Sequence, residues 1–76
     1  MELNEFIENF ADQFEDTEAN VITPETKFRD LDEWSSLIAL SVIAMIDEEY
    51  DVTINGEDMK SATTVQDLFN IVNSKV

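Results

Sequence analysis

The sequence predicts an all-α fold, a small four-helix bundle of three longer helices and one short helix, with a long loop between the first two longer helices. Apolar residues recur at spacings of three and four in the first, middle and last parts of the chain, as they do along helices that bury one face. Residues that favour helix N-termini stand at the start of the middle and last of these segments, at Ser35–Ser36 and Thr63–Thr64. The length of 76 residues corresponds to a single domain, residues 1–76.

Composition limits what this domain can do. It has 18 acidic and four basic residues and a formal net charge of −14, which repels nucleic acid and anionic membranes but attracts basic protein surfaces. It has no cysteine and no histidine, which excludes a disulfide framework, a thiolate metal site and a histidine general base. The N-terminus lacks a basic region with an apolar run, and no apolar stretch approaches the roughly 20 residues that span a bilayer. We therefore expect a cytoplasmic, monomeric protein that is not an enzyme and whose partners are proteins.

The first helix is expected over about residues 2–14. Its apolar residues fall on one face, with acidic side chains on the others: Leu3, Phe6, Ile7, Phe10 and Phe14. An aromatic stripe can form a ligand site, but burial of the rings, at roughly 1.5–3 kcal/mol each, is the commoner use. We assign these residues to the core.

The segment over residues 15–35 lacks helical periodicity. Residues 16–20 are typical of a solvated loop, and Thr23-Pro24-Glu25 suits one helical turn with proline at its first position. Connections longer than about 12–15 residues are usually functional or disordered. Five apolar residues provide anchors against the helices, so an ordered loop is expected here: Val21, Ile22, Phe28, Leu31 and Trp34.

The second helix is expected over residues 36–50, with Ser35 or Ser36 as its cap. At 3.6 residues per turn, one side carries the residues suited to the core: Ala39, Val42, Ile43, Ile46 and Tyr50. The opposite side carries Leu37, Ser41, Ala44 and Glu48, with Leu40 and Met45 at its borders and Asp47 nearby. An apolar centre with a charged rim is typical of a protein interface, but a central helix of a small bundle can also be buried on most sides. The pattern leaves both interpretations open.

The rest of the chain is expected to form a turn and two helices. In the turn over residues 51–56, Ile54 is predicted to be buried and Asn55-Gly56 suits left-handed backbone. A short third helix follows over about residues 57–62 and a last helix over about 64–75. Thr63 with Gln66 fits a capping box and Thr64 with Asp67 is a near match, so either threonine can be the cap. The inward stripe of the last helix is Val65, Leu68, Phe69 and Val72, with Ile71 at its edge.

Two features suggest chemistry. Residues 51–57 match the opening of a calcium loop, but Ala62 stands where such a loop needs a bidentate glutamate, and we expect no metal site. Ser36 stands where a loop becomes a helix, so its hydroxyl is placed at free N–H groups that favour an anion. Hydrolysis by a serine needs a base, and the chain offers no histidine and no lysine near Ser36. We therefore expect Ser36 to be modified by another enzyme.

Four segments of the chain resemble the acyl carrier protein family, whose serine carries a 4′-phosphopantetheine arm. In that family an Asp-Ser-Leu triplet opens the second helix, which ends in a Glu-Glu-Phe-like segment, and an isoleucine and a Thr-Thr-Val-Gln-like helix start follow. This chain has Ser35-Ser36-Leu37, Asp47-Glu48-Glu49-Tyr50, Ile54 and Thr63-Thr64-Val65-Gln66 at matching separations. The resemblance covers nearly the whole length.

The resemblance implies that a phosphopantetheinyl transferase moves the arm from coenzyme A onto Ser36, and that the arm then carries acyl groups as thioesters. It implies delivery to acyl-transferring and synthase enzymes of fatty-acid, lipid or polyketide-type biosynthesis. These enzymes would recognise, through basic patches, the following surface: Leu37, Leu40, Ser41, Ala44, Met45, Asp47 and Glu48, with Trp34 as a specificity element.

The chain departs from the family pattern at three places. Ser35 occupies the position of the family's aspartate, Ile38 and Ser41 replace polar and acidic residues, and Asp32-Glu33-Trp34 stands where a shorter glycine-containing segment is common. These departures favour a specialised carrier over a housekeeping one. The alternative class is an unmodified acidic helical module that binds a basic protein partner or calcium.

Overall fold

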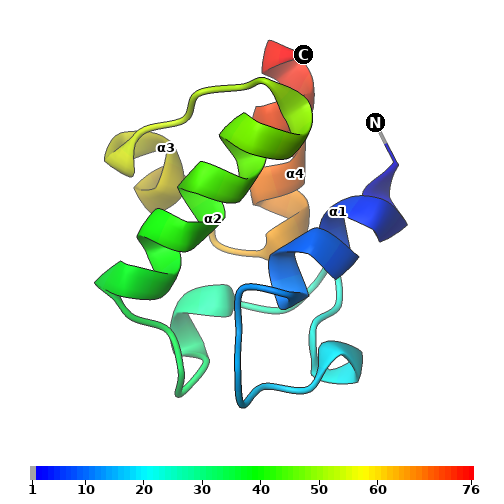
Figure 1. Ribbon diagram of the computed structural model, residues 1–76, viewed down its shortest axis with the longest axis vertical. Coiled ribbons are helices and arrows are strands. Elements are labelled where there is room, and N and C mark those ends of the chain that lie inside the picture. The colour runs from blue at the N-terminus through cyan, green and yellow to red at the C-terminus, as the bar shows by residue number, and fades with distance from the viewer. Residues whose placement is uncertain (1) are drawn as a thin grey trace.

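Four α-helices make up the fold of residues 2–76, the part of the chain that this computed structural model describes (Figure 1). They are α1 (Leu3–Ala11), α2 (Ser36–Tyr50), α3 (Gly56–Ser61) and α4 (Val65–Lys75), and two 3-10 helices, η1 (Ala19–Val21) and η2 (Phe28–Asp30), lie in the loop between α1 and α2. The prediction of an all-helical bundle with one short helix and one long loop is confirmed.

Helix α1 packs against both α2 and α4, and α3 packs against α4. The N-terminal ends of α2 and α4 point toward the long loop, and their C-terminal ends lie at the opposite end of the bundle (Figure 1). The loop therefore covers the end of the bundle at which α2 begins.

The core is organised around aromatic rings. Phe6 lies 5.9 Å from Tyr50 and 5.6 Å from Phe69, measured between ring centroids, and Phe10 lies 5.5 Å from Phe14 and 5.8 Å from Phe28. Such separations suit tilted and edge-to-face ring pairs. Phe6 and Phe10 also contact each other, and Trp34 contacts Phe28, so the five phenylalanines, Trp34 and Tyr50 form one connected network. The aromatic stripe predicted for the first helix is thus confirmed as core.

The long loop is held in place at several points. Phe28 and Ile22 are 0% and 4% exposed, and Leu31 and Trp34 are half-buried against the core. Backbone carbonyls of Thr26 and Pro24 accept hydrogen bonds from the N–H groups of Val65 and Gln66, at 3.1 and 2.9 Å, which satisfies two free donors at the start of α4. The predicted order of the loop agrees with this packing.

Two details of the loop prediction are wrong. Val21 is 51% exposed and does not anchor the loop. The segment Thr23-Pro24-Glu25 forms a single hydrogen-bonded turn, in which the Thr26 N–H donates to the Thr23 carbonyl at 3.0 Å, rather than a helix. Helical turns form instead on either side of it, at η1 and η2.

Two helix boundaries differ from those predicted. Helix α1 ends at Ala11 rather than near residue 14, because the chain tightens into turns in which Gln13 and Phe14 donate to carbonyls three residues earlier. Helix α3 begins at Gly56 because Asn55 is its cap. Asn55 has an extended backbone (φ −119°), and the left-handed residue of the connection is Asp51 (φ 56°), which ends α2. The predicted left-handed backbone at Asn55-Gly56 is therefore wrong.

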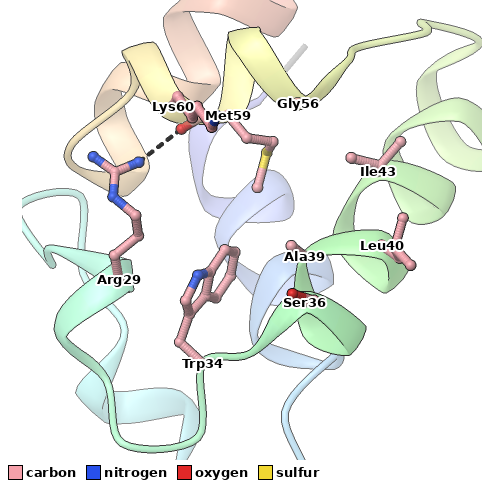
Figure 2. Close-up of a pocket in the computed structure, with 9 residues that line it drawn as sticks. All are labelled: Arg29, Trp34, Ser36, Ala39, Leu40, Ile43, Gly56, Met59 and Lys60. Atoms are coloured by element: carbon pink, nitrogen blue, oxygen red, sulfur yellow. Dashed lines mark hydrogen bonds between the residues drawn. The ribbon is translucent and has the colours of Figure 1, made fainter.

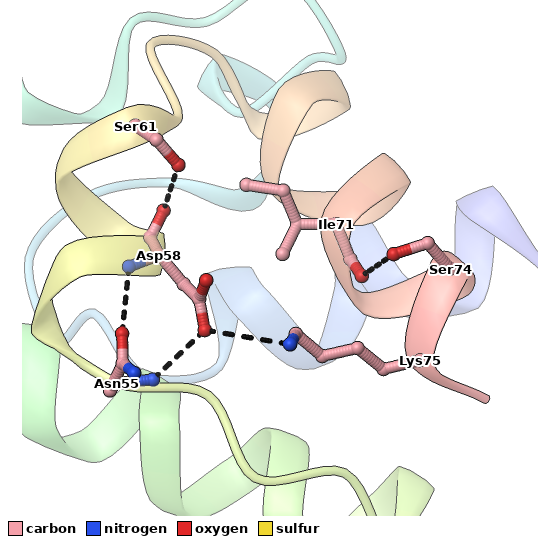
Figure 3. Close-up of polar contacts among 6 residues, drawn as sticks. All are labelled: Asn55, Asp58, Ser61, Ile71, Ser74 and Lys75. Carbon is pink, nitrogen blue, oxygen red and sulfur yellow. Dashed lines mark hydrogen bonds and ion pairs between the residues drawn. The ribbon is translucent and has the colours of Figure 1, made fainter.

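Capping boxes fix the starts of the last two helices. Asn55 and Asp58 exchange hydrogen bonds of 2.9 and 3.2 Å, and the Asp58 carboxylate lies 3.9 Å from the Lys75 Nζ atom, so it links α3 to the end of α4 (Figure 3). Thr64 caps α4 through a 3.1 Å bond from the Asp67 N–H to its hydroxyl. Of the two caps predicted as possible for the last helix, Thr64 is the one used.

Candidate functional site

Ser36 is the first residue of α2, and its side chain is exposed. The cap is Ser35, whose hydroxyl accepts a 3.3 Å hydrogen bond from the Ile38 N–H. The Ser36 hydroxyl has no hydrogen-bond partner among residues 2–76. Of the two caps that the sequence left open, Ser35 is therefore the one used.

At the helix start beside Ser36, two backbone N–H groups have no hydrogen-bond acceptor among the described residues. The Ile38 and Ala39 N–H groups are bonded to the Ser35 side chain and carbonyl, whereas those of Ser36 and Leu37 have no acceptor among the described residues. Free N–H groups at the positive end of a helix stabilise an anion by about 0.3–1 kcal/mol. The cap at position 35 is an uncharged serine, and the first turn of α2 carries no acidic residue.

A pocket of about 390 Å³ opens beside Ser36, between α2 and α3 (Figure 2). Helix α2 contributes Ser36, Ala39, Leu40 and Ile43 to its lining, and α3 contributes Gly56, Met59 and Lys60. Arg29 and Trp34 complete it from the loop. The sequence interpretation missed this pocket, because residues from three separate parts of the chain form it.

Trp34 joins the pocket to the core. Its ring centroid lies 4.9 Å from that of Phe28, and its ring is nearly parallel to that of Phe10, with 12° between the planes. In Figure 2 the indole lies between Arg29 and Ser36 and faces the pocket. Trp34, the predicted specificity element, therefore lines the same pocket as Ser36.

Arg29 connects the loop to α3 across the pocket. Its guanidinium donates a 2.8 Å hydrogen bond to the Met59 carbonyl and lies over the Phe28 ring, 5.4 Å from the centroid (Figure 2). The carbonyl belongs to the last turn of α3, where helical carbonyls lack partners within the helix. Arg29 thus helps to set the position of α3 relative to the loop.

Glu33 fixes the loop just ahead of Ser36. Its carboxylate accepts hydrogen bonds from the Glu15, Asp16 and Thr17 N–H groups at 2.7, 3.0 and 2.9 Å, and from the Thr17 hydroxyl at 2.8 Å. Partial desolvation raises the pKa of Glu33, but these hydrogen bonds to the charged form outweigh it, and the net pKa is lowered. One carboxylate therefore ties the chain after α1 to the chain before α2.

Most of the predicted docking surface is on the outside of α2. Leu37 and Leu40 are 72% and 63% exposed, and Ala44, Asp47 and Glu48 are exposed beside them. Ser41 is half-buried at the edge. The structure thus favours an exposed apolar surface with an acidic rim over a helix buried on most sides.

Met45 is the exception, because it is only 6% exposed and belongs to the core. The buried side of α2 includes Val42 and Ile46, as predicted, and extends to Met45. Ile43 packs against the core, as predicted, and also lines the pocket, and Ile38 packs against the core as well. The assignment of Met45 to the docking surface is therefore wrong, and the apolar residue at position 38 has a packing role.

The calcium interpretation finds no support at the α2–α3 connection. The Asn55 and Asp58 side chains bond to each other's backbone in the capping box. Residues 2–76 contain no group of three or more histidine, cysteine, aspartate or glutamate side chains that could hold a metal ion. Within the same residues, no helix is long and apolar enough to cross a membrane.

A small helical bundle with a free serine hydroxyl at the start of its second helix fits a carrier domain, the class that the sequence resembles. The family model for phosphopantetheine attachment sites matches residues 4–72, and the chain belongs to this family. Comparison with curated proteins and with solved structures gives no significant match.

Domains of this family carry 4′-phosphopantetheine as a covalent group, which agrees with the resemblance to acyl carrier proteins. The protein is accordingly a carrier domain, used by transferase and synthase enzymes, and the family is not one of catalysts.

Proposed function

We propose that Ser36 is the attachment residue and that the protein carries acyl intermediates as thioesters to enzymes of fatty-acid, lipid or polyketide-type biosynthesis. The observation that carries the assignment is the free, exposed Ser36 hydroxyl beside two unbonded helix N–H groups, in a chain whose neighbouring serine already serves as the cap. Ser35 is the only other serine near this helix start, and its hydroxyl is engaged.

The attachment reaction requires little of the carrier. The Ser36 Oγ atom attacks the phosphorus of coenzyme A that bears the pantetheine group, the transferase accepts the hydroxyl proton, and adenosine 3′,5′-bisphosphate leaves. The Ser36 and Leu37 N–H groups favour the phosphodiester anion at this position. When bound, the group supplies a terminal thiol that forms thioesters, which this chain without cysteine cannot supply itself.

Partner enzymes are proposed to dock on the outer side of α2. Leu37, Leu40 and Ala44 provide a small apolar contact, and Asp47 and Glu48 provide negative charge for basic patches. Ser41 lies at the edge of this contact, and Trp34, which lines the pocket beside Ser36, is the proposed specificity element. A small apolar centre and exposed rim charges give weak, salt-sensitive binding, which suits a carrier that must leave one enzyme for the next.

Intact mass tests the attachment site. After incubation with coenzyme A and a promiscuous phosphopantetheinyl transferase, the native chain should gain the mass of one phosphopantetheine. Ser36→Ala should gain nothing, whereas Ser35→Ala should still be modified although its helix start is less stable by about 1 kcal/mol. No gain by the native chain would favour an unmodified acidic module, and a gain by Ser36→Ala would refute the assignment of this serine.

A further inference from the structure

The pocket beside Ser36 differs in charge from the rest of the molecule. The whole chain has a net charge of −14, yet none of the nine residues that line the pocket is acidic. Two of the four basic residues, Arg29 and Lys60, are among the nine. The chain thus brings half of its cations to this one cavity.

Neither cation is neutralised by the protein. Among residues 2–76 the ion pair is Lys75 with Asp58, and no carboxylate lies within 4.0 Å of Arg29 or Lys60. Arg29 uses one N–H group on the Met59 carbonyl, which leaves other donors of its guanidinium free. In a chain with 18 acidic residues, two cations without an acidic partner at one pocket indicate an anionic ligand from outside the protein.

The arrangement in the pocket indicates where that anion lies. In Figure 2 Ser36 is on the α2 side, and Arg29 and Lys60 are on the far side, with Trp34 and Met59 between them. A phosphodiester on Ser36 stays on the α2 side, next to the helix N–H groups. The cations therefore suit a negative group at the distant end of what Ser36 carries, and the apolar side chains between suit its uncharged part.

We propose that the pocket selects short acyl cargo that ends in a carboxylate, which Arg29 and Lys60 bind while Trp34 and Met59 cover the chain between. The proposal rests on the function proposed above. A volume of about 390 Å³ is near the lower end of the roughly 300–1,000 Å³ of small-molecule pockets, which favours short cargo over a long fatty chain. Both cations are exposed, so water screens their attraction for a carboxylate and the expected selectivity is modest.

Thioester protection measures the selectivity. The native chain is loaded from glutaryl-coenzyme A or from valeryl-coenzyme A, which replaces the terminal carboxylate with a methyl group. Cleavage of each thioester by hydroxylamine is followed by intact mass. Protection is the ratio between the cleavage rate of the same thioester on coenzyme A and its cleavage rate on the protein. We expect glutaryl cargo to be protected about threefold to fivefold more than valeryl cargo, the effect of a partly exposed ion pair. The Trp34 emission should also shift more with glutaryl cargo, because this indole lines the pocket.

Charge-removing variants identify the source of the protection. Lys60→Gln is the first variant, since the Lys60 side chain makes no hydrogen bond among the described residues, and Arg29→Gln is the second. Lys27→Gln is the matched control, because it removes the same charge from an exposed residue outside the pocket lining. In the double variant Lys60→Gln/Arg29→Gln, the ratio of glutaryl to valeryl protection should fall to near one. In Lys27→Gln the ratio should stay as it is in the native chain. Far-UV circular dichroism establishes that each variant is folded.

Equal protection of the two cargoes on the native chain would overturn the proposal, and so would selectivity that survives loss of both cations. Selectivity lost equally in Lys27→Gln would also overturn it, because it would reflect net charge alone. A chain that cannot be loaded at all would instead contradict the proposed attachment at Ser36. The two failures are therefore distinguished by mass before cleavage begins.

Discussion

Replacing Phe28 with alanine tests whether the long loop is part of the folded core. The side chain is 0% exposed, and its ring centroid lies 5.8 Å from that of Phe10 and 4.9 Å from that of Trp34. Truncation of a buried phenylalanine to alanine costs about 3–5 kcal/mol, from lost burial and the cavity left behind. At about 0.05–0.15 kcal/mol per residue, the whole chain has an unfolding free energy of about 4–11 kcal/mol. The variant should therefore lose about a quarter or more of its stability.

Urea denaturation followed by circular dichroism measures the loss. The midpoint of Phe28→Ala should fall while the slope stays that of the native chain, because the same surface is exposed on unfolding. Phe28→Leu keeps most of the volume and should lose about 1 kcal/mol, so a measurable variant remains if alanine unfolds the protein. Val21→Ala is the control, since Val21 lies in the same loop but is 51% exposed, and it should change stability by less than about 0.5 kcal/mol.

Loss of less than about 1 kcal/mol in Phe28→Ala would refute this interpretation. It would mean that the loop does not fold cooperatively with the helices, and that Trp34 is not held against Phe28. The site would then lack the fixed wall that the pocket beside Ser36 requires.

Three further predictions concern polar groups. The lowered pKa of Glu33 stabilises the folded state above the ordinary value of 4.5, and this contribution is lost as the pH falls through the lowered pKa. The stability difference between the native chain and Glu33→Gln should thus be largest near pH 7 and shrink below about pH 4.5. Thr64→Ala removes the cap of α4 and should lose about 1 kcal/mol of stability, or about 4–8 °C in melting temperature. Thr63→Ala should lose less than about 0.5 kcal/mol, because the Thr63 hydroxyl is exposed and bonds to no described residue. With a net charge of −14, the native chain should melt at a higher temperature as sodium chloride rises from low to moderate concentration, because salt screens self-repulsion.

Each of these predictions has an opposing result. A stability difference for Glu33→Gln that is constant between pH 7 and pH 3 would show that its carboxylate bonds to the Glu15–Thr17 backbone contribute nothing. Equal losses in Thr64→Ala and Thr63→Ala would refute the assignment of the cap. A melting temperature that falls with added salt would indicate that attractive ion pairs outweigh repulsion.

The sequence predicted most accurately what local patterns determine. The bounds of α2 at Ser36 and Tyr50 were correct because a capping serine opens the helix and no residue within it interrupts the pattern. The Thr23–Glu25 turn was assigned to a helix because proline suits a first helical position, but hydrogen bonds from the start of α4 to the Pro24 and Thr26 carbonyls hold this segment in a turn. Such tertiary bonds leave no local signal in the sequence.

The sequence indicated a helix start at Ser36 but little of what surrounds it. The helix start has a local signature, whereas the extent of the buried side of α2 depends on how the neighbouring elements pack, and Met45 was therefore placed outside the core. The pocket could not be predicted, because Arg29 meets the Met59 carbonyl across 30 positions of sequence. The signal that was available is the scarcity of cations, since only four basic residues exist and two of them line the pocket.

Helix α2 separates two electrostatic environments, and Ser36 lies at the start of both. The outer side carries Asp47 and Glu48 beside exposed leucines, and the side toward α3 faces a pocket with two cations and no acidic residue. A carboxylate on the cargo is repelled from the outer side and attracted to the pocket, whereas a basic partner enzyme is attracted to the outer side. If partners dock as proposed, their cations would come near Ser36 and would compete with Arg29 and Lys60 for the same carboxylate. On this reasoning, binding of a partner and release of an acidic cargo from the pocket are coupled through charge, without a change in the fold.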